Sequence, residues 1–130
     1  MRLTPTQTIE YTSPRDPTEP ATVWSISAIT YTDTLDAQRE AGPVPVRGLT
    51  ALRGDNPDDP AADAARDWLA RYDLAICARG IKAIDGEQRS CADIRAALDS
   101  MRPTSAVRLV LSDIALKIAE LSAGDPAKKD

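Results

Sequence analysis

The 130-residue sequence predicts an α+β fold, in which an N-terminal two-stranded antiparallel hairpin packs on a bundle of about four helices. Two short segments before residue 31 are rich in alternating β-branched and aromatic side chains, which is typical of strands. Apolar residues recur at helical spacing over most of residues 60–122. Hydrophobic residues make up 42% of the chain, enough for one core, so we expect a single domain over residues 1–130.

The hairpin is predicted over residues 6–31. Its strands are TQTIEYT (residues 6–12) and ATVWSISAI (residues 21–29), separated by a polar segment whose prolines cannot continue a strand ladder. Two strands alone are marginally stable, so they must pack on the helices. The apolar residues that share a face are Ile9 and Tyr11 in the first strand, and Trp24, Ile26 and Ala28 in the second.

A short helix is predicted over residues 33–41, with Thr32 or Asp33 as N-cap and Gly42-Pro43 as its stop. Residues 42–60 are rich in Pro, Gly and Asp and predict a loop without regular structure. Its apolar side chains follow no clear period. These side chains are Val44, Val46, Leu49 and Leu52. Either they pack the loop onto the core, or they belong to a mobile arm that binds a partner.

The helix that organises the chain is predicted from Pro60 to Gly80. Asp59 is the expected N-cap, and Pro60 suits the first helical position, where its missing N–H is no loss. Gly80 is expected to end the helix in a left-handed conformation. Because the buried stripe holds one of the two tryptophans, we expect the core to form around this helix. The stripe comprises Ala65, Trp68, Leu69, Tyr72 and Ile76, with Asp73 outside it.

Two further helices complete the predicted helical part. The first is capped by Ser90, with Asp93 completing a capping box, and ends before Pro103. The second follows Thr104, and residues 123–130 form a charged tail that we expect to fray. The predicted stripes are Cys91, Ile94, Leu98 and Met101 in the first helix, and Val107, Val110, Leu111, Ile114, Ile118 and Leu121 in the second.

The inventory of side chains argues against an enzyme. The chain has no histidine, which removes Ser-His, Cys-His and His-metal sites, and its six glycines form no phosphate-binding loop. Cys77 and Cys91 are expected to be small buried or half-buried side chains, although the sequence leaves a disulfide between them open. We therefore expect no catalytic residue, no cofactor and no metal.

The net charge and the hydropathy of the chain limit the classes of partner that we expect it to bind. A net charge of −4 and a pI near 4.8 argue against a protein that binds nucleic acid or an anionic membrane. The N-terminus has no apolar signal core, and no run approaches the roughly 18 apolar residues of a membrane span. We expect a soluble cytoplasmic protein.

Leu109 and Leu116 fall outside the apolar stripe of the last predicted helix. Either they are scattered surface hydrophobes, which every protein has, or they belong to a patch for self-association or for an amphipathic partner helix. The candidate protein-binding residues are therefore Val44, Val46, Leu49, Leu52, Leu109 and Leu116.

Several short motifs then follow a recognisable order along the chain, except over residues 43–60. In the first half they are Asp16-Pro17 with Pro20, the strand Val23-Trp24-Ser25-Ile26, and the step Ile29-Thr30 into a charged helix. In the second half they are Arg79-Gly80-Ile81, the turn Asp85-Gly86, the helix end Met101-Arg102-Pro103 and the final Leu121-Ser122. This order resembles that of the small tail assembly chaperones of siphophage-like phages and prophages.

The resemblance implies a non-enzymatic protein of the host cytoplasm that self-associates and coats the hydrophobic helices of the tape-measure protein. Tail-tube subunits would displace it as they polymerise. It implies no catalytic residues. Two alternatives remain open at this point: a structural tail or head-completion component of the virion, and a small phage-encoded inhibitor that binds a host protein.

Overall fold

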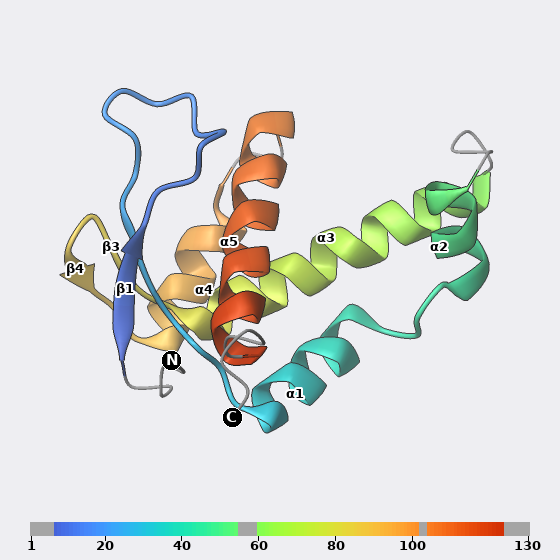
Figure 1. Cartoon of the computed structure of the whole chain (residues 1–130), viewed down its shortest axis with the longest axis horizontal. Helices are drawn as coiled ribbons and strands as arrows, with labels where there is room; N and C mark the ends of the chain where they lie inside the picture. Colours follow the sequence, from blue (N-terminus) through green and yellow to red (C-terminus); the bar gives the residue numbers. More distant parts are fainter. Residues whose placement is uncertain (1–6, 55–59, 102–103, 124–130) are drawn as a thin grey trace, which may run out of the picture.

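The computed structural model describes residues 7–54, 60–101 and 104–123. Within these residues it has an α+β fold in which one antiparallel sheet packs beside helices (Figure 1). The elements, in order, are β1 (Thr8–Tyr11), β2 (Trp24–Ser27), α1 (Tyr31–Ala41), α2 (Val46–Arg53), α3 (Pro60–Gly80), β3 (Ile81–Ile84), β4 (Glu87–Gln88), α4 (Cys91–Asp99) and α5 (Ser105–Ala123).

The sheet has four strands in the described residues, in the order β1-β2-β3-β4, rather than the hairpin alone. The predicted pairing of the first two strands is present, with Ile9 opposite Ile26. β3 then pairs with β2 and places Ile81 opposite Ile26 and Ile84 opposite Trp24. The prediction missed β3 and β4 because four and two residues are too short to show an alternating pattern.

The described residues contain five helices, and α2 lies where a loop was predicted over residues 42–60. That prediction was wrong because tertiary packing, not local preference, stabilises this eight-residue helix. A Cβ atom on Gly48 would lie only 2.3 Å from the main-chain oxygen of Ala61, so α2 rests directly on α3. Pro45 serves as N-cap and so lies outside the helix. Residues 55–59, including the expected cap Asp59, lie outside the described residues.

Helix α1 begins two residues before its predicted start. Its N-cap is Thr30, whose hydroxyl accepts a hydrogen bond from the Asp33 main-chain N–H at 3.0 Å. The Asp33 carboxylate accepts one from the Thr30 N–H at 3.2 Å, which completes a capping box. The caps predicted at Thr32 or Asp33 were therefore wrong, since both residues lie within the first turn. The predicted stop is confirmed, because Gly42 ends α1 with φ of 91°.

Gly80 does not end α3 in a left-handed conformation as predicted. The described glycines with positive φ are Gly42 and Gly86, and Gly80 passes directly into β3. A Cβ atom on Gly80 would lie 2.4 Å from Cδ1 of Ile118. The glycine is therefore needed for the close approach of α5 to α3.

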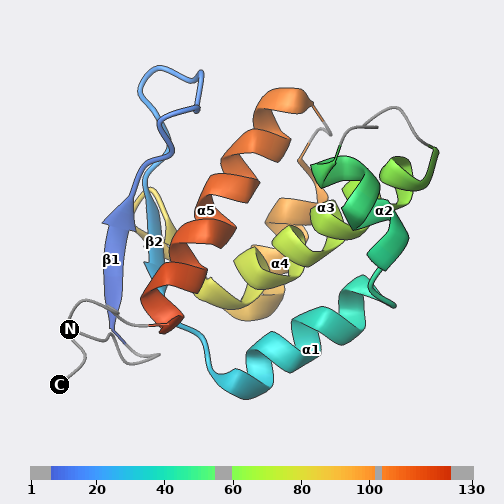
Figure 2. The ribbon, with the colours of Figure 1, turned by 45° about the vertical axis from the view of Figure 1, so that its right-hand side comes forward.

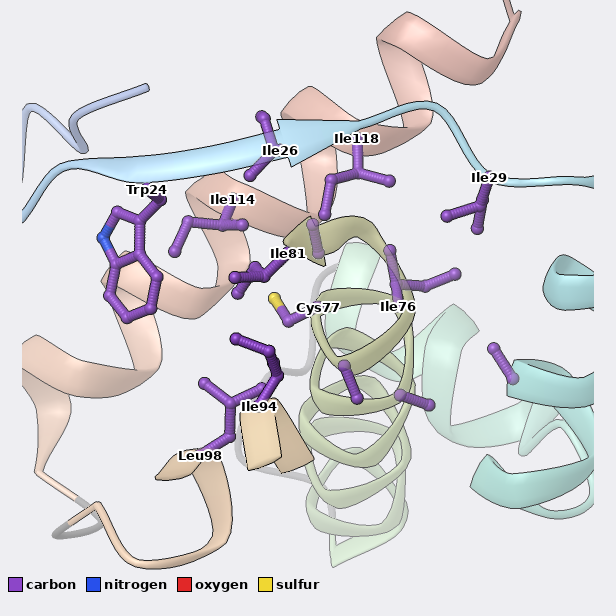
Figure 3. Packing of buried hydrophobic residues seen from close by; sticks show 14 of the residues in the cluster. Trp24, Ile26, Ile29, Ile76, Cys77, Ile81, Ile94, Leu98, Ile114 and Ile118 are labelled. Carbon is purple, nitrogen blue, oxygen red and sulfur yellow. The ribbon is translucent and has the colours of Figure 1, made fainter. Parts of the chain in front are cut away.

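The main hydrophobic cluster surrounds the C-terminal half of α3 (Figure 3). Ile76 and Cys77 meet side chains from β2, β3, α4 and α5 there, so the prediction of a core around this helix is confirmed for that half. Trp68 lies outside the cluster: it stacks on Tyr72 at a centroid distance of 5.2 Å and donates a hydrogen bond to the Gly42 oxygen at 2.9 Å. The larger members contributed by other elements are Trp24, Ile26, Ile81, Ile94, Leu98, Ile114 and Ile118.

The caps of the last two helices are confirmed. Ser90 accepts a hydrogen bond from the Asp93 N–H at 3.2 Å, and Thr104 accepts one from the Val107 N–H at the same distance. Cys77 is fully buried, but Cys91 is exposed because it occupies the first position of α4, and both are free thiols. The prediction that Cys91 lies in a buried stripe was wrong. The tail was predicted from residue 123, but Ala123 is the last residue of α5. Pro103 and residues 124–130 lie outside the described residues.

Candidate functional site

A groove between α3 and α5 is the candidate functional site. The two helices are in close contact at Gly80 and Ile118, near their C-terminal ends, and at Cys77, whose thiol donates to the Leu111 oxygen at 3.3 Å. They diverge toward their N-termini (Figure 1). A cavity of about 260 Å³ lies where they have separated. Its lining is Arg66, Leu69, Ala70 and Asp73 from α3, and Arg108, Leu109, Leu111 and Ser112 from α5, and we call it the α3–α5 groove.

The lining follows from the helical period. Residues 66, 69, 70 and 73 share one face of α3, and residues 108, 109, 111 and 112 share one face of α5. Leu69, Ala70 and Leu111 are half-buried and give the groove an apolar interior. Leu109 is 41% exposed at the edge. The result is an open apolar groove that a side chain from another molecule can enter.

Asp73 places one carboxyl group in this apolar interior. It is half-buried and accepts a hydrogen bond from the Ser112 side chain. Burial raises the pKa of Asp73 to about 6, and the hydrogen bond from Ser112 opposes that rise only in part. Among the ion pairs of the described residues, none involves Asp73. The groove therefore carries a carboxylate that lacks a cationic partner within the described part of the chain.

Two arginines lie at the edge of the groove, both largely exposed. The Arg66 guanidinium pairs with the Asp63 carboxylate at 2.8 Å, one turn earlier on α3. Arg108 lies on α5 beside Leu109. Solvent screens these exposed charges more strongly than it screens the half-buried carboxylate of Asp73.

The loop after β1 is held against α5 next to Leu109. Asp113 accepts hydrogen bonds from the Ser13 hydroxyl at 2.6 Å and from Nε of Arg15 at 3.0 Å. The Arg15 hydrogen bond, aided by the one from Ser13, lowers the pKa of Asp113. The Arg15 guanidinium also donates to the Leu109 main-chain oxygen at 3.4 Å, so the loop is anchored to α5 beside Leu109 at the edge of the groove.

Leu116 lies two turns after Leu109 on the same side of α5 and is 63% exposed. Asp113, which pairs with Arg15, lies one turn from each of the two leucines on this side of α5. The sequence correctly singled out the two leucines as off the main stripe, and both side chains reach the surface.

The remaining candidate residues lie on a separate surface. Val44 and Val46, just before and at the start of α2, are 51% and 69% exposed. Leu49 and Leu52 are half-buried on α2. Because α2 lies at the N-terminal end of α3, away from most of α5, the structure does not bring the two groups together (Figures 1 and 2).

Sequence reasoning missed the α3 side of the groove. It assigned Leu69 to the buried stripe and placed Asp73 outside that stripe, whereas the two residues line one cavity. Their spacing of four residues was the available signal. What the sequence lacked was the position of α5, which turns this face of α3 into the wall of a groove.

The described residues contain no group of three or more metal-ligating side chains. No helix in the described ranges is long and apolar enough to cross a membrane. No protein-family model, curated protein or solved structure matches the chain. The chemistry of the groove must therefore supply the functional argument.

Proposed function

We propose that the chain is a non-enzymatic tail assembly chaperone, which acts in the host cytoplasm and binds amphipathic helices of a tape-measure protein. The observation that carries the proposal is the open apolar α3–α5 groove with Leu109 at its edge. An amphipathic helix presents large apolar side chains every three or four residues, and one or two of them would fill a cavity of about 260 Å³.

The expected strength of this contact suits a chaperone. Burying one leucine-sized side chain contributes about 1.5–3 kcal/mol, and part of that gain is lost to the entropy of association. Leu109 and Leu116 together would therefore give a reversible complex with any single client helix. Many copies along a long client would bind it firmly as a set, and tail-tube subunits would displace them one at a time.

The exposed pair Val44 and Val46 is the proposed self-association surface. It lies apart from the α3–α5 groove, so a copy of the chain would bind a client and a neighbouring copy at once (Figure 1). This arrangement supports a homo-oligomer that coats a helical client.

Co-expression with the tape-measure protein of the same genome tests the proposal. We expect size-exclusion chromatography with light scattering to give a large soluble complex, and the tape-measure protein to be insoluble when expressed alone. Purified virions should lack the chain. A monomer that leaves the tape-measure protein insoluble would contradict the proposal, and an abundant presence in virions would favour a structural component instead.

A further inference from the structure

We infer that the α3–α5 groove selects a basic side chain: its occupant is an amphipathic segment that places a lysine or arginine against Asp73, surrounded by apolar contacts. The inference rests on the proposed function and adds the chemistry of the partner. It differs from a purely apolar docking surface because it predicts which residue enters the interior of the groove.

The Asp73 carboxylate lies in the apolar interior of the groove with few bonding partners. An ionised carboxylate can accept about four hydrogen bonds. Within the described residues, the hydrogen bond that Asp73 accepts comes from the Ser112 side chain. A half-buried charge without a counter-ion is unfavourable. A cation that enters the groove restores the missing interactions, whereas an anion would be repelled.

The charges around the groove are distributed between its interior and its edge. Asp73 is the one acidic residue among the described residues that line the cavity. One turn further along α3, the Cys77 thiol stays neutral. Burial and the nearby charge of Asp73 raise the pKa of this thiol well above its ordinary value. Arg66 and Arg108 lie at the edge, and the first is held by Asp63. The complementary segment thus has a basic residue at its centre and acidic residues on its flanks.

The inference predicts a particular pH dependence. Above pH 6 the Asp73 carboxylate is charged and attracts the cation, and below pH 6 a proton occupies it instead. The chain has no histidine, the usual source of titration in this range. Loss of cation binding between pH 7.5 and 5 therefore reports on Asp73, with an expected decrease in affinity of about tenfold.

The test uses small probes and the full chain. Benzylammonium carries a cation on an apolar ring, benzyl alcohol is its neutral counterpart, and benzoate is the anionic one. We expect NMR titrations at pH 7.5 to show benzylammonium binding more tightly than the other two, with shifts at Ala70 and Leu109. Its affinity should fall about tenfold at pH 5 while that of benzyl alcohol stays constant.

Two variants complete the test. Asp73→Asn keeps the size of the side chain and should abolish both the preference for the cation and its pH dependence. Asp67→Asn is the matched control, because this exposed carboxylate of α3 pairs with Arg71 at 3.0 Å outside the groove, and it should change neither.

Equal binding of all three probes, a preference for benzoate, failure of every probe to bind, or an unchanged cation preference in Asp73→Asn would overturn the inference. The proposed function has a separate test in the solubility of the tape-measure protein. If the chaperone activity is present but the cation preference is absent, the groove is an apolar site and only the inference fails.

Discussion

The two halves of α3 serve different purposes. In the C-terminal half, the residues from Ala75 to Gly80 are enclosed by the sheet, α1, α4 and α5, and all of them except Arg79 are buried. The N-terminal half contacts α2 and, through Trp68, the end of α1, and on another side it lines the α3–α5 groove. One helix thus joins the core of the molecule to its candidate binding surface.

The residues that contact each half explain the difference. Isoleucines and Trp24 fill the space around the C-terminal half, whereas small residues form the contact of the N-terminal half with α2: Gly48 lies against Ala61 and Ala65. Small residues bring helices close together but bury little apolar area per residue. We therefore expect stability to reside mainly at the C-terminal half, while the N-terminal half is available for binding.

The largest expected effect compares the two tryptophans. Trp24→Ala should reduce the free energy of unfolding by about 4–5 kcal/mol, because it leaves a cavity in the main cluster. Trp68→Ala should reduce it by about 3 kcal/mol, through a smaller cavity and the loss of the hydrogen bond to Gly42. Urea denaturation measures both. A loss below 1 kcal/mol for Trp68→Ala, or a reversed order, would contradict this division of α3.

The next comparison concerns the two glycines at helix contacts. Gly48→Ala should destabilise by about 2–3 kcal/mol, since its Cβ would meet a main-chain oxygen that moves only if α2 and α3 separate. Gly80→Ala should destabilise by a similar amount, about 2–3 kcal/mol, because its Cβ would meet both branches of Ile118, a fully buried β-branched side chain with one preferred rotamer. Thermal unfolding of both variants tests the two contacts, and a loss below about 1 kcal/mol for Gly48→Ala would show that α2 is not seated on α3.

Asp73 gives a smaller effect that depends on pH. Between about pH 4 and 6 the folded chain holds a proton on Asp73 that the unfolded chain has released, so stability falls as pH rises through this range. Asp73→Asn removes that fall. The variant should match the parent near pH 4 and be more stable by about 1–2 kcal/mol at pH 7.5, allowing for partial solvent screening. Urea denaturation of the variant and the parent at several pH values measures the difference in their free energies of unfolding. A difference that stays constant between pH 4 and 7.5 would contradict the titration of Asp73 in this range.

The smallest expected effect on stability is at the surface of α5. Leu116→Glu should change the free energy of unfolding by less than about 0.5 kcal/mol, since its side chain is 63% exposed. The same substitution should weaken client binding, as should Leu109→Glu at the edge of the groove. Circular dichroism of the variants and light scattering with the client measure the two properties, and an unfolded variant would place the leucine in the core.

The sequence predicted those parts of the fold that depend on local patterns. Pro60 and the apolar period located α3, Ser90 and Thr104 located the starts of α4 and α5, and Trp24 with Ile26 identified the core strand. Prediction from the sequence failed where tertiary contacts determine the local structure. Strand β3 owes its place to pairing with β2, and α2 owes its stability to contact through Gly48.

The site was predicted only in part for the same reason. Leu109 and Leu116 depart from the period of their own helix, so a single sequence reveals them. Asp73 belongs to the groove only because α5 diverges from α3 beside it, and that crossing depends on Gly80 and Ile118. A groove between two helices is a property of their packing, which no local pattern encodes.

The most direct test of the central claim compares Leu109→Glu with Val46→Glu in co-expression with the tape-measure protein. Both substitutions place a charge on an exposed apolar position, one at the α3–α5 groove and one on α2. We predict that Leu109→Glu leaves the tape-measure protein insoluble, while Val46→Glu still solubilises it in a complex of lower oligomeric mass. Full solubilisation by Leu109→Glu would contradict the account.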